Sequence, residues 1–405
     1  MIAKGRLIAL TLPAILMACG TTAAPSAPAS PTPQATPVAA AAPCNGGKPK
    51  VAAPAAPHGV FVLVPSGSAQ MAAAINQYLI PNSAICGANF WVRWNSVDKG
   101  PAATARYDWS SVETEIAQWE RLGKTVNLIV IGAAEGASTK QGATPSWVQS
   151  QVQMVTCANS QPTPVFWQPG YETNWKEFIK QTVSHFAGDK YIGYIRFGLG
   201  HGGEDLVDGG ADAGPCKQMW DAKGYQTEWM PYNQRMLDYM GALRSTKQLM
   251  VGLNNFNGKA DLGAAVAEKS AQLGIGFGMQ GLASGDVTSV AQHQPCRDAD
   301  WCSLFNRYAG QVPLEVQTLA ASNPAGGPVK PGIPGTGPGS SLSMLTGPLP
   351  PLLTTALAVH AQIFELYAND CLIAFDPDWA GYAEYHAAYA AAIQSTAAAV
   401  GTAGG

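Results

Sequence analysis

Eight short apolar runs, separated by longer stretches with helical periodicity, dominate the chain from residue 58 onward. A run of four to eight apolar residues is typical of a buried strand, whereas apolar residues three and four positions apart are typical of a helix. In 109–124, for example, Val112, Ile116, Trp119 and Leu122 recur at helical spacing. The predicted strands are 59–64, 88–94, 125–132, 191–198, 248–254, 274–281, 312–318 and 371–376. The predicted helices are 109–124, 174–188, 229–245, 260–274, 348–368 and 381–396.

Strands that alternate with helices form parallel sheets, because each helix returns the chain to the same end of the sheet. Eight strands in roughly 340 residues are typical of a (β/α)8 TIM barrel. The alternative is an open doubly wound sheet, but no GxGxxG motif follows the first predicted strand. In a barrel the loops after the strands lie together at the carboxyl-terminal face, where active sites occur. The long loops expected there are 133–170, 199–224, 282–301 and 319–347, with 323–340 acting as a mobile flap.

Export of the protein is predicted from its first residues. Lys4 and Arg6 precede the apolar stretch LIALTLPAILMA, which is too short to cross a membrane as a helix. The stretch ends in LMAC, which resembles the lipobox of bacterial lipoproteins, and the resemblance implies lipidation at Cys19. An ordinary signal peptide with an unrelated cysteine is the alternative. Gly20, in place of an aspartate, favours the outer membrane if the cell is Gram-negative.

Four segments follow along the chain. Residues 1–19 are a lipoprotein signal peptide, and residues 20–57 are an Ala/Pro-rich tether that buries too little apolar surface to fold. Residues 58–399 form the (β/α)8 domain, and 400–405 are a flexible tail. The protein is therefore expected in the cell envelope, as a monomer anchored to the membrane by lipid.

Composition excludes several classes of partner. The net charge is −3 and no basic patch is interleaved with aromatic residues, so no nucleic-acid partner is expected. No Cys/His spacing typical of zinc is present, and we expect neither a metal nor a cofactor. Without Cys19, seven cysteines remain, so one is left without a partner in the chain. Disulfides are expected in an exported protein, with Cys296 close to Cys302, and with Cys157 and Cys216 in two loops that can share a face.

The stretch YIGYIRFGLGHGGEDL, residues 191–206, runs from a predicted strand through glycines to a carboxylate. Glycines allow sharp turns and a close approach of backbone to ligand. Glu204 therefore lies where a catalytic carboxylate of a barrel would lie, beside His201. The alternative is a solvated loop glutamate next to Asp205. The acidic loop 205–214 lacks the spacing of a calcium-binding EF-hand.

A second carboxylate lies inside the predicted strand 312–318. Successive strand side chains point to opposite faces, so Glu315 and Gln317 share the face opposite to Leu314 and Val316. An unpaired buried carboxylate is costly, which indicates a polar cluster at the barrel mouth. Glu315 paired with a core arginine for structural reasons is the alternative. The arginines expected to hold it are Arg93 and Arg196.

Several short motifs resemble clan A glycoside hydrolases. YDWSSVETEIAQWERLGKTVNLIV (107–130) is similar to their second helix and third strand, ATPSWV to a loop after strand three, and VRW to an arginine motif of strand two. The resemblance places IRFGLGHGGE at the acid/base of strand four and PLEVQT at the nucleophile of strand seven. The family has Asn before the acid/base, whereas Gly203 stands here. Contact with the sugar 2-hydroxyl is then expected from His201 or Asn254.

The resemblance implies a mechanism that uses two carboxylates. In retaining glycosidases the acid/base and the nucleophile stand about 5–5.5 Å apart. Glu204 and Glu315 are the expected catalytic pair. Tryptophans at or after strand ends are expected to stack on sugar rings, and these are Trp94, Trp147, Trp167, Trp220, Trp229 and Trp379. The residues expected to bind substrate are Arg93, Trp94, Trp147, His201, Asn254, Gln317 and Trp379.

The sequence thus predicts a cell-envelope glycoside hydrolase that cleaves a polysaccharide or oligosaccharide by a retaining mechanism. The alternative is a non-catalytic protein that keeps the barrel and binds glycan or scaffolds an envelope assembly. Gly203 in place of Asn favours this alternative.

Overall fold

The computed structural model describes residues 56–64, 69–133, 142–157, 161–207, 214–253, 260–292, 301–323, 345–379 and 382–402. The signal peptide, Cys19, most of the tether, Asn254, most of the expected flap and the extreme carboxyl terminus lie outside these residues.

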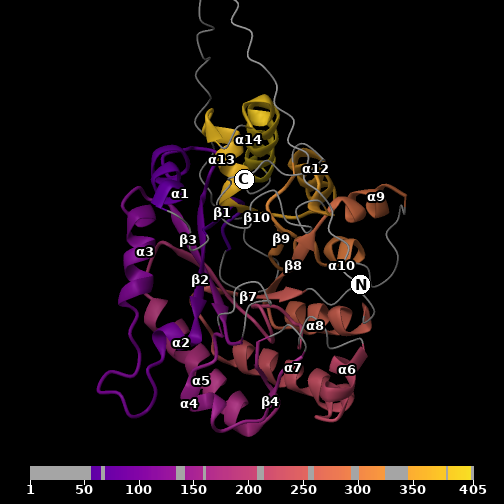
Figure 1. Ribbon diagram of the computed structural model, residues 1–405. Coiled ribbons are helices and arrows are strands. Elements are labelled where there is room, and N and C mark those ends of the chain that lie inside the picture. Colours follow the sequence, from indigo (N-terminus) through magenta and orange to yellow (C-terminus); the bar gives the residue numbers. More distant parts are fainter. Residues whose placement is uncertain are drawn as a thin grey trace, which may run out of the picture. The chain divides into compact units, whose positions relative to one another are not determined.

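A closed barrel of eight parallel strands forms the centre of the fold (Figure 1). The order around the barrel is β1, β2, β3, β6, β7, β8, β9 and β10, and β10 pairs with β1 to close it. The bounds are Gly59–Val64, Gly87–Arg93, Thr125–Ile131, Ile192–Phe197, Gln248–Leu253, Gly276–Leu282, Leu314–Thr318 and Ile363–Tyr367. Neighbouring strands are also neighbours in sequence, which confirms the predicted (β/α)8 barrel.

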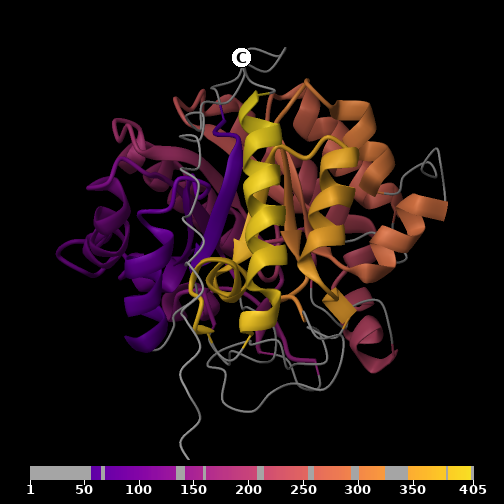
Figure 2. The same ribbon diagram turned by 90° about the horizontal axis from the view of Figure 1, so that it is seen from above.

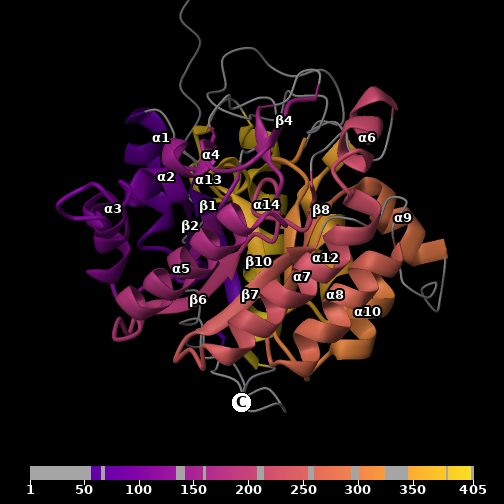
Figure 3. The same cartoon turned by 90° about the horizontal axis from the view of Figure 1, so that it is seen from below.

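A helix follows every barrel strand, and helices pack on the outside of the barrel, as the views from above and from below show for α14 and for α7 and α8 (Figure 2, Figure 3). Strand β1 is followed by α1 (Ala69–Ala74), which continues into a π-helical turn at Ile75–Leu79. The other helices that lead from strand to strand are α3 (Ser110–Glu120), α5 (Pro169–Phe186), α7 (Tyr225–Ala242), α8 (Ala260–Gln272), α10 (Trp301–Tyr308) and α12 (Leu349–Ala358), and α14 (His386–Thr402) completes the ring. The short helices α2 (Trp94–Val97), α4 (Ser146–Gln149), α6 (Gly214–Asp221) and α9 (Ser284–Gln292) lie in the loops that follow strands.

The eighth strand is not the predicted one. Residues 371–376 belong to the helix α13 (Ala368–Phe375), and the strand is β10, inside the segment predicted as a helix at 348–368. Residues Ala368–Ala374 of α13 are all buried, the polar Asn369 and Asp370 included, so no exposed polar face marks the helical period. Helix α12 ends before His360, whose φ of 68° breaks the helix and allows a strand to begin.

Apolar side chains fill the barrel at two levels, with polar side chains between them. One cluster comprises Ala56, Phe61, Cys86, Tyr194, Met250 and Ile363. The other lies toward the carboxyl ends of the strands and comprises Leu63, Ile129, Ile131 and Ala143, with Trp91 and Tyr367 packed on it. A much larger apolar core fills the space between the barrel and the helices.

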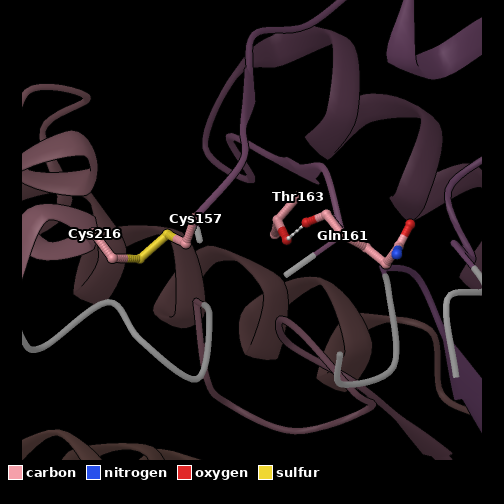
Figure 4. The surroundings of a disulfide bond; sticks show 4 residues. All are labelled: Cys157, Gln161, Thr163 and Cys216. Atoms are coloured by element: carbon pink, nitrogen blue, oxygen red, sulfur yellow. Dashed lines mark hydrogen bonds between the residues drawn. A yellow bond between two sulfur atoms is a disulfide. The ribbon is translucent and has the colours of Figure 1, made fainter. Parts of the chain in front are cut away.

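Cys157 and Cys216, which were expected in two loops that can share a face, form a disulfide (Figure 4). It joins the segment between β4 (Met154–Val155) and β5 (Thr163–Pro164) to α6 across 59 positions of sequence. Cys86 and Cys302 are also disulfide-bonded, to partners outside the described residues. Among the described cysteines Cys371 is free, and it is buried. Within the part of the chain that the structure describes, no helix is long and apolar enough to span a membrane.

Candidate functional site

Glu315 lies inside the barrel with its side chain fully buried. Its Oε1 accepts a hydrogen bond of 2.6 Å from the Tyr194 hydroxyl, and its Oε2 accepts one of 2.7 Å from Arg196. The neighbouring position on β8 is Gly278, where a Cβ would lie 2.7 Å from Glu315 Oε2. The missing side chain at Gly278 therefore makes room for the carboxylate. The predicted inward direction of Glu315 is confirmed, but it lies near the start of β9, deeper than the predicted mouth.

Arg196 holds two carboxyl groups. Its Nη1 donates to Glu315 and, over 3.1 Å, to Oε2 of Glu365 on β10. Its Nη2 donates to Gln317 over 3.3 Å and to the second oxygen of Glu365 over 3.4 Å. The side chain of Arg196 is 3% exposed and that of Glu365 is fully buried. Of the two arginines predicted to hold Glu315, Arg196 is the one that makes this contact.

Glu365 and Glu315 share the single positive charge of Arg196 in a buried site, and this affects the pKa of Glu365. Burial raises the pKa of Glu365, Arg196 opposes the rise and the charge of Glu315 adds to it, with the result at about 8. Two like charges in a dry site cannot both ionise freely. Glu365 therefore keeps its proton at neutral pH.

Two asparagines complete the polar layer. Asn89 donates from Nδ2 to the Tyr194 hydroxyl over 2.8 Å and also to Glu365 Oε2. Asn127 donates to Asn89 Oδ1 over 2.8 Å and accepts from the Tyr194 backbone N–H over 3.1 Å. Asn89 and Tyr194 thus fix both carboxyl groups, and side chains from β2, β3, β6, β9 and β10 form one connected network.

The glycines after β6 build a tight loop. Glu204 N donates to His201 O over 3.1 Å, and Gly202 and Gly203 between them have φ of 66° and 83°. This is the pattern of a type I′ turn, which strongly favours glycine at both central positions. A Cβ on Gly198 would lie 2.5 Å from Gly203 Cα, and one on Gly200 would lie 2.0 Å from Leu206 O. Each of the four glycines is therefore required by the turn or by a close approach.

This loop folds back over the barrel. A Cβ on Gly203 would touch Ile131 and Ile129 of β3 at 3.5 and 3.6 Å, and Gly203 O would lie 3.1 Å from a Cβ on Gly252 of β7. The loop thus reaches the carboxyl ends of strands on both sides of β6. His201 is buried in it, with 7% of its surface exposed.

Glu204 is half-buried next to the polar layer. Burial raises the pKa of Tyr367, the hydrogen bond with Gln317 opposes the rise, and the negative charges of Glu365 and Glu204 add to it, so both carboxyl groups act on the Tyr367 hydroxyl. The Tyr367 hydroxyl accepts a hydrogen bond of 3.3 Å from Gln317 Nε2. Because Gln317 also contacts Arg196, the surroundings of Glu204 and Glu315 are joined through Tyr367, Gln317 and Arg196.

Most of the expected sugar platforms are core residues. Trp94 is fully buried on α2, where it stacks on Phe178 and donates to Asp98 over 3.0 Å. Trp379 is 4% exposed and follows a helix instead of the eighth strand. Trp220 and Trp229 are also buried. These four tryptophans offer no open face to a sugar, and the prediction for them is wrong in this structure.

Trp147 and Trp167 are half-buried. The Trp147 ring lies under the Arg106 guanidinium, 5.0 Å away, and Trp167 donates to Lys223 O over 2.9 Å. Arg93 is half-buried at the end of β2. Burial raises the pKa of Glu115 in α3, and the positive charge of Arg93 opposes this rise.

Sequence reasoning missed Glu365, Tyr194, Asn89 and Tyr367. A signal for Glu365 exists, because IFELY alternates between two faces as a strand should. This alternation was overlooked because residues 363–367 had been assigned to the predicted helix 348–368. No group of three or more acidic, His or Cys side chains in the described ranges has the arrangement of a metal site.

No known protein family and no curated protein matches the sequence. The fold resembles the catalytic domain of beta-amylase from Paenibacillus polymyxa, with 12% identity, a TM-score of 0.54, and coverage of 84% of this chain and 97% of that one. A thermostable mutant of the xylanase Xyn10A from Cellvibrio japonicus has 12% identity, a TM-score of 0.48 and the same coverage. Xylanase 10B from Thermotoga petrophila has 11% identity, a TM-score of 0.47, and coverage of 84% and 94%. The likeness to the beta-amylase domain shows the fold of this chain, a (β/α)8 barrel.

Proposed function

We propose that this protein is a glycoside hydrolase in which Glu204 is the general acid/base and Glu315 the nucleophile. The observation that carries the proposal is the connected polar network inside the barrel. It contains Glu315 on the seventh barrel strand, and the charge of Glu204, on the loop at the carboxyl end of the fourth strand, acts on its member Tyr367. Active sites of this fold lie at that end. The beta-amylase likeness supports the barrel, and the chemistry is argued from the residues.

The two carboxylates have the environments that such a reaction needs. Arg196 and Tyr194 donate to both oxygens of Glu315, which fixes the orientation of the carboxylate. Glu204 is half-buried, on a loop that the glycines shape. In a retaining mechanism Glu204 would protonate the leaving oxygen while Glu315 attacks the anomeric carbon. The substrate would be a polysaccharide or an oligosaccharide.

Access to Glu315 requires the loop 198–207 to move. The carboxylate is fully buried, and Gly203 packs over Ile129 and Ile131. Outward displacement of the type I′ turn would uncover Ile129 and Ile131, and the apolar cluster to which they belong would also have to move to open a path to Glu315.

The burial of Glu315 also favours a second candidate, a glycan-binding protein without activity. In that case Glu315 and Arg196 only stabilise the barrel, and binding takes place on the outer loops. The two candidates differ in a single measurable property, the release of new reducing ends.

The test is hydrolysis of a panel of polysaccharides by the wild type, Glu315→Gln and Glu228→Gln. Glu228 is exposed on α7 and serves as the matched control. We expect turnover by the wild type and by the control, and none by Glu315→Gln, which should still bind the glycan. Binding without hydrolysis by the wild type would establish the second candidate. The anomer first released reports whether configuration is retained.

The proposed location is the cell envelope, with a lipid on Cys19 that anchors the protein to the membrane. The lipobox and the Ala/Pro-rich segment after it support this proposal. A single acyl chain gives only marginal anchoring, so at least two are required for stable attachment.

A further inference from the structure

Three ionisable side chains share a site with one positive charge. Arg196 lies 2.7 Å from Glu315 and 3.1 Å from Glu365, and both distances run from the same nitrogen, Nη1. The exposed fractions of the three side chains are 3%, 0% and 0%. Water therefore does not compensate for any imbalance among them. A buried ion pair that loses one partner is strongly destabilised, because the remaining charge is left unpaired.

The groups around Glu365 contain no second cation among the described residues. From β6 it faces Arg196 and Tyr194, from β9 Glu315, and from β2 the amide of Asn89. Tyr367 follows on the same strand, with Glu204 beyond it. The tyrosine hydroxyls hold their protons, since burial raises the pKa of both well above the ordinary value. The proton balance of the site is thus set by Glu315 and Glu365 together.

We propose that Glu365 is a reserve counter-ion: it shares Arg196 and one proton with Glu315, and takes over Arg196 when Glu315 is neutral. The geometry allows the exchange without movement of the chain, because Arg196 already donates to both oxygens of Glu365. No new partner has to be recruited. The arrangement behaves as a pair with a common titration and not as two independent carboxyl groups.

This assignment makes Glu365 a positioning residue. It acts on the reaction through Arg196 and Glu315 and does not itself contact substrate. The role of Glu365 in turnover rests on the proposed function. The sharing of Arg196 between Glu365 and Glu315 does not depend on that function. The experiment below therefore uses no substrate.

The first measurement is a double-mutant cycle of thermal unfolding at pH 7 with Glu315→Gln, Glu365→Gln and the double variant. Glutamine keeps the size and the hydrogen-bonding capacity of a protonated glutamic acid. Each single variant leaves one carboxyl group for Arg196, so each should still unfold cooperatively. The double variant leaves Arg196 buried without a counter-charge, and its loss of melting temperature should exceed the sum of the two single losses. Additive losses would overturn the proposal.

The second measurement is infrared difference spectroscopy at pH 7, which detects the carbonyl stretch of a protonated carboxylic acid. Glu365→Gln should remove this band relative to the wild type. Glu315→Gln should remove it as well, because Glu365 then ionises to pair with Arg196. A band component that is lost in Glu365→Gln but persists in Glu315→Gln would show that Glu365 keeps its proton and would overturn the exchange. Asp370, whose pKa burial raises to about 7, contributes equally to all the proteins compared.

The outcomes separate the two proposals. If the wild type cleaves no glycan but the cycle is non-additive and the band disappears in both variants, the proposed function alone fails. If glycan is cleaved and Glu315→Gln keeps the band, the reserve counter-ion alone fails. If Glu315→Gln does not fold, Glu365 does not serve as the counter-ion of Arg196 in that variant, and this outcome also contradicts the proposal.

Discussion

At the scale of single residues, buried carboxyl groups give the protein a defined dependence on pH. Burial raises the pKa of Glu365 to about 8, and burial likewise raises that of Asp370 to about 7. Asp370 accepts from the backbone N–H and the hydroxyl of Ser322, over 2.9 and 2.6 Å, and so ties the loop after β9 to α13. Both acids hold a proton more tightly in the folded chain than in the unfolded chain.

The sign of the effect on stability follows directly. Where the folded state binds more protons than the unfolded state, the free energy of unfolding falls as the pH rises. The contribution of Glu365 is fully present below its ordinary pKa of 4.5 and is lost by about pH 8. We expect Glu365→Gln, which mimics the protonated form, to unfold with a weaker pH dependence between these limits.

The measurement is the unfolding free energy in urea at several pH values, for the wild type and for Glu365→Gln. The contribution of Asp370 is common to both proteins and cancels in the difference. The variant should gain stability relative to the wild type as the pH rises, with a plateau above about pH 8. A constant difference across the range would mean that Glu365 does not titrate in this window.

At the scale of elements, the loop 198–207 shows how four glycines place one carboxylate. Two of them supply the left-handed conformations of the turn, and the other two allow strand end and loop to touch. A side chain at Gly198 would press on the backbone of Gly203, which cannot yield without moving the residue next to it, Glu204.

We therefore expect Gly198→Ala to lower turnover on the order of 100-fold, since small misplacements of a catalytic group have effects of this size. The control is Gly123→Ala, at a glycine with φ of 70° and nothing within 4 Å of its Cβ position. The control carries the strain of a left-handed alanine, ~1–2 kcal/mol, without touching the site. Equal turnover in the two variants, measured at equal folded fraction, would show that the loop does not position Glu204.

The sequence predicted seven of the eight strands, because short apolar runs that alternate with helical segments are a strong local signal. Period-two alternation within one of these runs predicted the inward direction of Glu315. The sequence did not predict the strand β10 or the contact of Arg196 with both Glu315 and Glu365. Glu365 lies in a five-residue strand between two apolar helices, and its meaning depends on Arg196, 169 positions away. Contacts of this kind leave no trace in local periodicity.

The burial of the tryptophans could not be predicted from their positions in the sequence either. Trp94 follows a barrel strand, where a sugar platform is plausible, yet the chain turns into α2 and packs the ring against Trp175 and Phe178 of α5. A position after a strand end fixes which end of the barrel a residue lies at. It does not fix whether the side chain faces the cleft or the helices.

At the scale of the whole molecule, the proposal combines a barrel with an attachment to the membrane. The proposed lipobox would place the acyl chains on Cys19, which precedes the barrel domain in the sequence. We expect Cys19→Ala to move the protein from the membrane fraction to the soluble fraction, with its hydrolytic activity unchanged. Fractionation followed by immunoblotting measures this, and Cys371→Ala, at the buried free cysteine, controls for loss of a cysteine as such. Retention of Cys19→Ala in the membrane fraction would show that another feature anchors the protein.

The central claim is that Glu204 protonates the leaving group while Glu315 attacks, and the most direct measurement is the rate of the first chemical step in Glu204→Gln on two substrates. One substrate is the natural polysaccharide, and the other is an aryl glycoside with a good leaving group, which needs little protonation. The account predicts a loss on the order of 100-fold or more on the polysaccharide and a far smaller loss on the aryl glycoside. Equal losses on both substrates, or a wild-type rate on the polysaccharide, would contradict it.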